Sequence, residues 1–172
     1  MRLYEYIQQG GSIMYVLLFL NIIGFALMIT KFWLFTKENK ALGSRIGDMS
    51  AHIKGDSEKK DIQAIIEITK QEVASYINNI EKGLNTVKII ASISPLLGLL
   101  GTVLGVLGAF KVMATQGTGD PSLFASGISV ALITTVGGMI VAIPHFIGHN
   151  YLIGQLDSIE AKVEKELMSQ VL

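Results

Sequence analysis

Three long stretches of the sequence contain no charged residue, and they constrain the fold more than any other feature. They run from 13 to 30, from 89 to 110 and from 121 to 148. A helix needs about 20 mostly apolar residues to cross a bilayer, and lipid offers no partner for an unpaired backbone group. Each stretch is long enough for one span. The sequence therefore predicts an all-α integral membrane protein with three transmembrane helices.

The composition agrees with this class and excludes several others. Half of the residues are hydrophobic and 16% are charged, whereas a soluble domain has about a quarter of its residues charged. Without cysteine there is no disulfide framework, cysteine zinc site or thiol nucleophile. The 14 basic residues are balanced by 14 acidic ones, so no basic surface for nucleic acid is expected.

The positive charges are distributed unevenly around the three stretches. Ten Lys and Arg residues lie between 31 and 88 and two more in the C-terminal tail, against Arg2 and Lys111 on the other side. The positive-inside rule then places the loop and the tail in the cytoplasm and the N-terminus outside. The expected segments are an N-terminal part with the first span (1–36), a cytoplasmic loop and helix (37–88), the second span (89–110), an external loop (111–120), the third span (121–149) and a cytoplasmic tail helix (150–172).

The ends of the spans carry residues that are typical of membrane interfaces. Trp33 and Phe35 are expected to anchor the first span, with Lys31 extending its ammonium to the headgroups. The apolar run is too long for a signal peptide and lacks a cleavage pattern, so we expect it to be retained. Asp120 and Pro121 are typical of an N-cap and a first helical position at the start of the third span.

From Asp61 onward, apolar or small residues recur at alternating spacings of three and four. This pattern predicts a single helix of roughly 50 residues, about 75 Å long, that passes from the cytoplasm into the second span. Its first half is aliphatic, as burial in water requires, and its second half is small, as close packing in lipid requires. The stripe consists of Val73, Ile77, Ile80, Leu84, Val87, Ala91, Ser94, Gly98, Gly101, Gly105 and Gly108.

The third span and the tail repeat the pattern. Small residues share one face within the span, and an aliphatic stripe follows after His149, so the second and third spans are both predicted to extend into the cytoplasm. In contrast, segment 38–60 contains three glycines and is predicted to be a solvated, partly helical loop; binding of anionic lipid by its basic residues is left open. The two stripes are Gly127, Ala131, Thr134, Gly138 and Ala142, then Leu152, Leu156, Ile159, Val163 and Leu167.

Small residues in the spans predict close helix packing, above all Gly98, Gly101, Gly105, Gly108 and Gly138. One interpretation is a hairpin of the second and third spans within a single chain. The glycines of the second span cover more than one face, however. Self-association into a ring is therefore the sharper hypothesis.

Other polar and helix-breaking residues in the spans are few. No Asp, Glu, Lys or Arg lies in the middle of any span, although a protein that moves protons alone usually carries an intramembrane carboxylate. Pro95 and Pro144 each free a backbone carbonyl and predict either a fixed kink or a hinge. His145 and His149 share a helix face, but no third ligand is near in sequence. We therefore expect no metal, no cofactor and no enzyme activity.

Two motifs resemble the signatures of the MotA/TolQ/ExbB proton channel family. The first is PLLGLLGTVLG at 95–105, followed by Ala109 and Phe110. The second is ISVALITT at 128–135, followed by Gly138, by VAIP at 141–144 and by Asn150. The resemblance covers about 88–151, and the three-span layout agrees along the whole chain. Within the family the chain is most similar to the ExbB type, in a short form without a long N-terminal periplasmic extension.

The resemblance implies a pentameric ring in the bacterial inner membrane, with the second and third spans around a central pore. It also implies an ExbD-like single-span partner with an essential Asp in the pore, and a TonB-like protein that transmits motion to an outer-membrane transporter. The family pattern puts pore-facing threonines at Thr102 and Thr135, and Thr134 is included in the expected proton pathway. Where close relatives carry a Glu, this chain has Val130, which leaves more of the proton transfer to the partner's Asp.

Two kinds of alternative stay open. A sister function, either TolQ-like envelope maintenance or a flagellar stator, would use the same motifs, although the stator branch has four spans. A non-conducting membrane scaffold would explain the glycine stripes equally well. The scaffold would not explain why Thr102 and Thr135 lie in matching motifs, and a conductance measurement with the partner present would separate the two.

Overall fold

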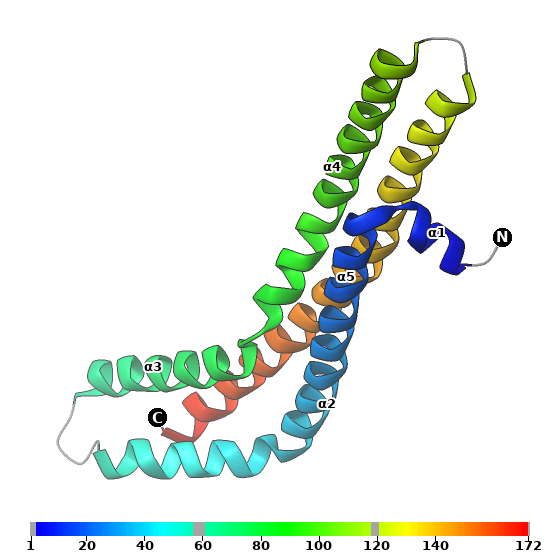
Figure 1. Cartoon of the computed structure of the whole chain (residues 1–172). Helices are drawn as coiled ribbons and strands as arrows, with labels where there is room; N and C mark the ends of the chain where they lie inside the picture. The colour runs from blue at the N-terminus through cyan, green and yellow to red at the C-terminus, as the bar shows by residue number, and fades with distance from the viewer. Residues whose placement is uncertain (1–2, 57–60, 118–120, 172) are drawn as a thin grey trace. The chain divides into compact units, whose positions relative to one another are not determined.

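The computed structural model describes residues 3–56, 61–117 and 121–171, and nearly all of them are helical. The five helices are α1 (Leu3–Gln9), α2 (Gly11–Asp56), α3 (Ile62–Glu81), α4 (Leu84–Gln116) and α5 (Pro121–Val171) (Figure 1). Segments of α2, α4 and α5 are long and apolar enough to cross a membrane. The predictions of an all-α chain and of three candidate spans are confirmed.

The chain divides into two compact units. Unit 1 consists of Met1–Ala26 and Thr86–Gly148, and unit 2 consists of Leu27–Asn85 and His149–Leu172. Both α2 and α5 continue from one unit into the other. Each of these helices therefore has one part that packs in unit 1 and another that packs in unit 2.

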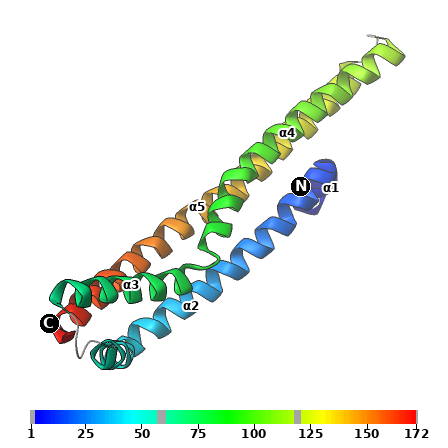
Figure 2. The same ribbon diagram turned by 90° about the vertical axis from the view of Figure 1, so that its left-hand side faces the viewer.

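In unit 1, α4 and the first part of α5 lie side by side and run in opposite directions (Figures 1 and 2). Leu17 of α2 joins Ile90 and Val141 in a small apolar cluster. Within the most apolar window of each helix, only 11% of the α2 residues and 28% of the α4 and α5 residues are buried. Most of the apolar surface of the three candidate spans is thus available to lipid or to other protein chains.

In unit 2, the last part of α2, α3 and the end of α5 enclose a larger aliphatic cluster. The tail stripe that the sequence predicted supplies one side of it, and the apolar residues of α3 supply another. Its buried members are Phe35, Leu42, Ile46, Ile53, Val73, Ile77, Ile80, Leu84, Leu152, Leu156, Ile159, Val163 and Leu167.

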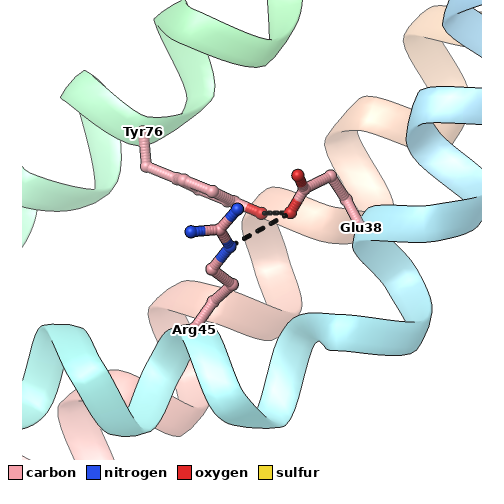
Figure 3. A network of polar contacts seen from close by, with 3 residues as sticks. All are labelled: Glu38, Arg45 and Tyr76. Carbon is pink, nitrogen blue, oxygen red and sulfur yellow. Dashed lines mark hydrogen bonds and ion pairs between the residues drawn. The ribbon is translucent and has the colours of Figure 1, made fainter.

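A polar cluster in unit 2 connects α2 and α3 (Figure 3). The Tyr76 hydroxyl donates to Glu38 Oε2 at 2.9 Å, and Arg45 Nε lies 3.7 Å from the same oxygen. Glu38 is only 8% exposed, so its carboxylate is turned toward the inside of the unit. Burial and the neighbouring carboxylate raise the pKa of Tyr76 from its usual 10.0 to about 12.

The expected single helix from Asp61 into the second span is interrupted. Helix α3 ends at Glu81 with Lys82 as its C-cap, and α4 begins at Leu84. Gly83 between them has a φ of 94°, a left-handed conformation that glycine adopts without steric cost. The prediction of one continuous helix was wrong. The turn does not change the spacing of the stripe, so the spacing gave no sign of the break. The buried face itself was predicted correctly on both sides of the turn, with Val73, Ile77, Ile80, Leu84, Val87, Ala91 and Ser94 all buried.

The described parts of two segments predicted as loops are more helical than expected. Helix α2 continues without a break to Asp56, and Gly43 and Gly47 lie within it. Its buried residues Leu42, Ile46 and Ile53 follow a helical spacing that packs into unit 2, and this burial outweighs the low helix propensity of glycine. Helix α4 likewise extends to Gln116, into the expected external loop. The predicted N-cap Asp120 lies outside the described residues.

The residues expected to anchor the first span face in different directions. Trp33 is 75% exposed, as an interfacial residue would be. In contrast, Phe35 is 3% exposed within the unit 2 cluster, and Lys31 is 8% exposed. Lys31 Nζ donates to the Ile80 carbonyl at 2.8 Å, which satisfies a carbonyl near the C-terminal end of α3. The predictions for Phe35 and Lys31 were wrong because both residues share the helix face that packs in unit 2.

Candidate functional site

The α4–α5 contact in unit 1 depends on glycines that bring two backbones together. A Cβ added at Gly98 would lie 2.8 Å from the Thr134 carbonyl oxygen, and one added at Gly138 would lie 2.5 Å from the Ser94 carbonyl oxygen. Real Cβ atoms do not approach backbone so closely. Any larger residue at either position would force the two helices apart.

The other predicted packing glycines differ among themselves. The space beside Gly101 is filled by the Thr134 side chain, and a Cβ at Gly105 would lie 2.9 Å from the Gly127 carbonyl oxygen. Gly108 is exposed and has no neighbour within 4 Å of an added Cβ. Gly108 thus takes no part in packing within the chain, whereas Gly98, Gly101, Gly105 and Gly138 line the helix contact.

The two threonines of the third-span motif lie at the same contact but with different exposure. Thr134 is 1% exposed, and its hydroxyl donates to the Ala131 carbonyl at 2.8 Å, with the Gly98 carbonyl at 3.3 Å. Thr135 is partly exposed, and its hydroxyl lies 3.4 Å from the Gly98 carbonyl oxygen. Thr134 is enclosed between α4 and α5 of one chain, where it packs beside Gly101, and its place in the proton pathway stays a prediction.

Thr102 lies one turn after Gly98 on α4 and is also partly exposed. Its hydroxyl donates to the Leu99 carbonyl at 2.6 Å. The side chain borders a shallow surface hollow of about 380 Å³ whose other walls are Val103, Val106, Leu107 and Phe110. Thr102 therefore provides a hydroxyl at the edge of an otherwise apolar groove.

The carbonyl of Gly98 connects these groups. It accepts from α5 hydroxyls, and it stands one helical turn before Thr102. Since each threonine hydroxyl already donates its hydrogen to a carbonyl, its oxygen lone pairs remain the groups that can accept a further hydrogen bond. These hydroxyls can therefore accept a hydrogen bond from a neighbouring donor, and none of them is charged.

Both proline positions lie inside helices that continue through them, Pro95 in α4 and Pro144 in α5. A buried polar residue stands next to each proline. The Ser94 hydroxyl donates to the Ile90 carbonyl at 2.6 Å, and His145 Nδ1 lies 2.7 Å from the Val141 carbonyl oxygen. The two accepting carbonyls are neighbours of the ones that the prolines free, which are those of Ala91 and Ile140. A hinge at either proline stays a prediction.

His145 is a buried residue that the sequence did not single out for packing. Its ring is fully buried, occupies the space beside Gly24 of α2 and makes an edge contact with Phe25, at 4.9 Å between ring centroids. A carbonyl can only accept, so the bond to Val141 requires the proton on Nδ1 and leaves Nε2 without a partner. A glycine in the middle of the first span was the one signal that could have indicated this contact.

His145 and His149 are the two histidines whose spacing on one helix face could have suggested a metal site. Within the described ranges, no group of three or more His, Cys, Asp or Glu side chains is arranged to hold a metal ion.

The comparisons with known proteins agree with these motifs. The model of the MotA/TolQ/ExbB proton channel family matches residues 38–165. The biopolymer transport protein exbB1 of Vibrio cholerae is 35% identical over 134 residues, which are 77% of this chain and 57% of that protein. ExbB of Helicobacter pylori is 34% identical over 59% of this chain and 74% of its own length.

A TolQ protein is also similar to the chain. The Tol-Pal system protein TolQ of Haemophilus influenzae is 34% identical over 49% of this chain and 37% of its own length. The chain thus spans little more than half of the Vibrio protein and a smaller part of TolQ. With three apolar helices and relatives from a family of channels rather than enzymes, this is a multi-pass membrane protein. The chain belongs to the MotA/TolQ/ExbB proton channel family.

Proposed function

We propose that the chain is the channel subunit of an ExbB-like motor that couples the proton motive force to transport across the outer membrane. Five copies would form a ring in the bacterial inner membrane, with α4 and α5 around a central pore. The apolar surfaces of α4 and α5 that remain exposed in one chain, together with the open face at Gly108, support association with further copies.

The observation that carries the proposal is the contact at the Gly98 carbonyl. It brings the hydroxyl of Thr135 on α5 next to the turn of α4 that holds Thr102. Both side chains are partly exposed, so they could face a pore. Thr134 lies between the helices, and its place in the pathway stays a prediction.

The proton itself would be carried by a partner. No Asp or Glu lies between Leu84 and Gly117, and Val130 stands at the family's Glu position. An ExbD-like single-span helix with one intramembrane Asp would supply the carboxylate, and the threonine oxygens would accept its hydrogen bond when it is protonated. One proton that crosses 100 mV releases about 2.3 kcal/mol, which is enough to bias motion between states of similar energy. A TonB-like protein would pass this motion on.

The orientation follows from charge. The excess of Lys and Arg in segment 31–88 and in the tail favours the cytoplasm for both, and a periplasmic N-terminus.

The test removes one hydroxyl at a time without changing side-chain volume. We expect Thr102→Val and Thr135→Val each to abolish partner-dependent proton flux in liposomes and growth on a transporter-dependent nutrient, while native mass spectrometry still detects the intact oligomer. Thr102→Ser and Thr135→Ser should restore both. Thr115→Val is the matched control, because Thr115 is an exposed α4 threonine whose hydroxyl bonds only within its own helix. Normal flux in both valine variants would disprove the pathway.

TolQ-like envelope maintenance is the second candidate, on the strength of the TolQ relative. The gene should be expressed in one strain that lacks its ExbB-type subunit and in another that lacks its TolQ-type subunit. Rescue of envelope integrity alone would favour the TolQ function. A ring that binds the partner but conducts no protons would favour the non-conducting scaffold.

A further inference from the structure

One face of α2 combines exposed aromatic and basic side chains. Trp33, Lys37 and Lys40 follow one another at spacings of four and three, so they lie on one side of the helix. All three are exposed, and they border an open surface hollow of about 600 Å³ together with Phe32 and Thr36. Phe32 is held in place by a stacked contact with Tyr151, with 6.5 Å between ring centroids.

The neighbouring charges of this segment are turned away from that face. The carboxylate of Glu38 points inward, where Tyr76 and Arg45 bind it. The ammonium of Lys31 is buried against the Ile80 carbonyl. In the part of the chain that the structure describes, no carboxylate lies within ion-pair distance of Lys37 or Lys40. Among the described residues, the two lysines of this outer face therefore have no acidic partner.

The part of α2 that precedes this face indicates that lipid covers it. Before Thr30, α2 is a charge-free run whose exposed side chains, such as Phe19 and Ile22, suit lipid tails. Trp33 follows directly, and Trp is enriched where acyl chains meet headgroups. Lys37 and Lys40 then stand one and two turns further along, at headgroup level. Asn39 accepts a hydrogen bond from Lys162 of α5 at 3.3 Å, which adds another cation to the segment.

We propose that Trp33, Lys37 and Lys40 form a binding site for the phosphate headgroup of an anionic phospholipid. The lysines bind the phosphate, while Trp33 and Phe32 pack against the glycerol and the first acyl carbons. The site is independent of proton conduction, since it uses residues of α2 in unit 2 and none of the α4–α5 contact. It would fix the depth at which α2 leaves the bilayer.

The chain carries its own probe for this site, because Trp33 is its only tryptophan. The full-length protein is reconstituted in vesicles that contain phosphatidylglycerol and phosphatidylcholine, with bromine on the acyl chains of one lipid or the other. We expect brominated phosphatidylglycerol to quench Trp33 well beyond its share of the lipid. The preference should fall about fivefold for each lysine removed and should weaken as salt is added.

The variants are chosen to separate this site from general surface charge. Lys37→Gln/Lys40→Gln should lose the preference, and Lys37→Arg/Lys40→Arg should keep it. Lys70→Gln/Lys165→Gln is the matched control, because it removes two other exposed lysines of unit 2 and leaves the site intact. Equal quenching by both lipids, or an equal loss in the control, would overturn the proposal. Equal quenching by both lipids, combined with binding of inorganic phosphate that Lys37→Gln/Lys40→Gln abolishes, would assign the lysines to free phosphate instead of a lipid.

Discussion

The two units use the same helical spacing with different chemistry. In unit 2 the stripe of α3 is made of Val73, Ile77 and Ile80, and side chains fill the space between helices. In unit 1 the stripe continues as Ser94, Gly98 and Gly101, and at Gly98 the backbones of α4 and α5 lie in contact. Lipid tails are as apolar as the side chains, so burial gains little there and close approach replaces it.

The polar groups follow the same division. In unit 1 the buried hydroxyls of Ser94 and Thr134 donate to backbone carbonyls, and no charge is involved. In unit 2 a carboxylate, a guanidinium and a phenol form the network around Glu38. Burying a charged group costs less free energy where water still reaches part of the cluster. The exposed Arg45 side chain provides such access to water. The solvent of each region thus decides which contacts can hold its helices together.

The largest expected effect comes from adding a side chain in unit 1. Gly138→Leu would drive a Cβ into the Ser94 carbonyl and the Gly98 backbone, and neither can move independently of its helix. We expect a loss of about 3 kcal/mol or more in the free energy of unfolding. The measurement is unfolding of the full chain in mixed detergent, followed by the loss of helical signal.

Gly108→Leu is the matched control for this substitution. It adds the same atoms to a helical glycine of the same unit, but nothing lies within 4 Å of the added Cβ. We expect the unfolding free energy of the single chain to stay nearly constant. If both variants lose the same stability, the close α4–α5 approach is not what stabilises unit 1.

The next effect comes from removing a side chain in unit 2. Leu167 is fully buried in the aliphatic cluster, so Leu167→Ala should cost about 2 to 3 kcal/mol through lost burial and a residual cavity. Ile62→Ala in the same unit removes an exposed side chain and should change stability by about 0.5 kcal/mol at most. Equal effects in the two variants would mean that side-chain burial is not what stabilises unit 2.

The spacing of apolar residues predicted which side chains are buried, but it did not predict where the chain changes direction. The stripes predicted correctly that Leu84, Val87 and Leu156 are buried, because a helix repeats its faces regardless of what it packs against. They could not predict the turn at Gly83. Leu84 follows Ile80 by four positions whether the chain continues or turns, and the backbone angles of Lys82 and Gly83 distinguish the two cases.

The sequence alone could not show which glycines touch another helix or whether a lysine is buried. Gly47 and Gly98 are both helical, yet one faces open space and the other touches a neighbouring backbone. Only the packing of a second helix separates the two cases. Lys31 was expected at the surface because charged residues are rarely buried, but a carbonyl 49 positions later in the chain satisfies it. The contact between His145 and Gly24 also depends on helices distant in sequence, and spacing within one helix cannot reveal it.

The smallest expected effect tests the charged network around Glu38 in unit 2. Tyr76→Phe removes the hydrogen bond to Glu38 and leaves the partly buried carboxylate with Arg45 at 3.7 Å as its one remaining partner in the network. We expect a loss of about 1 kcal/mol in unfolding free energy near neutral pH. Unit 1 should be unaffected, so the α4–α5 contact should resist protease as in the unsubstituted chain.

The pH dependence of the same variant gives the sharper result. The folded chain holds the pKa of Tyr76 at about 12, above the usual 10.0 that applies once the chain unfolds. The unfolded chain therefore releases this proton first, and the contribution of Tyr76 is complete below pH 10 and is lost as the pH rises toward 12. The free energy of unfolding should fall more steeply over this range in the unsubstituted chain than in Tyr76→Phe. The difference in tyrosinate absorbance between the two folded proteins should appear at a higher pH than the usual 10.0, near 12. Parallel stability curves, or a difference absorbance that rises at the usual pKa of tyrosine, would mean that the phenol is not held by Glu38. In that case the aliphatic cluster alone would stabilise unit 2. The two units would then differ only in that side-chain burial stabilises unit 2 and close backbone approach stabilises unit 1.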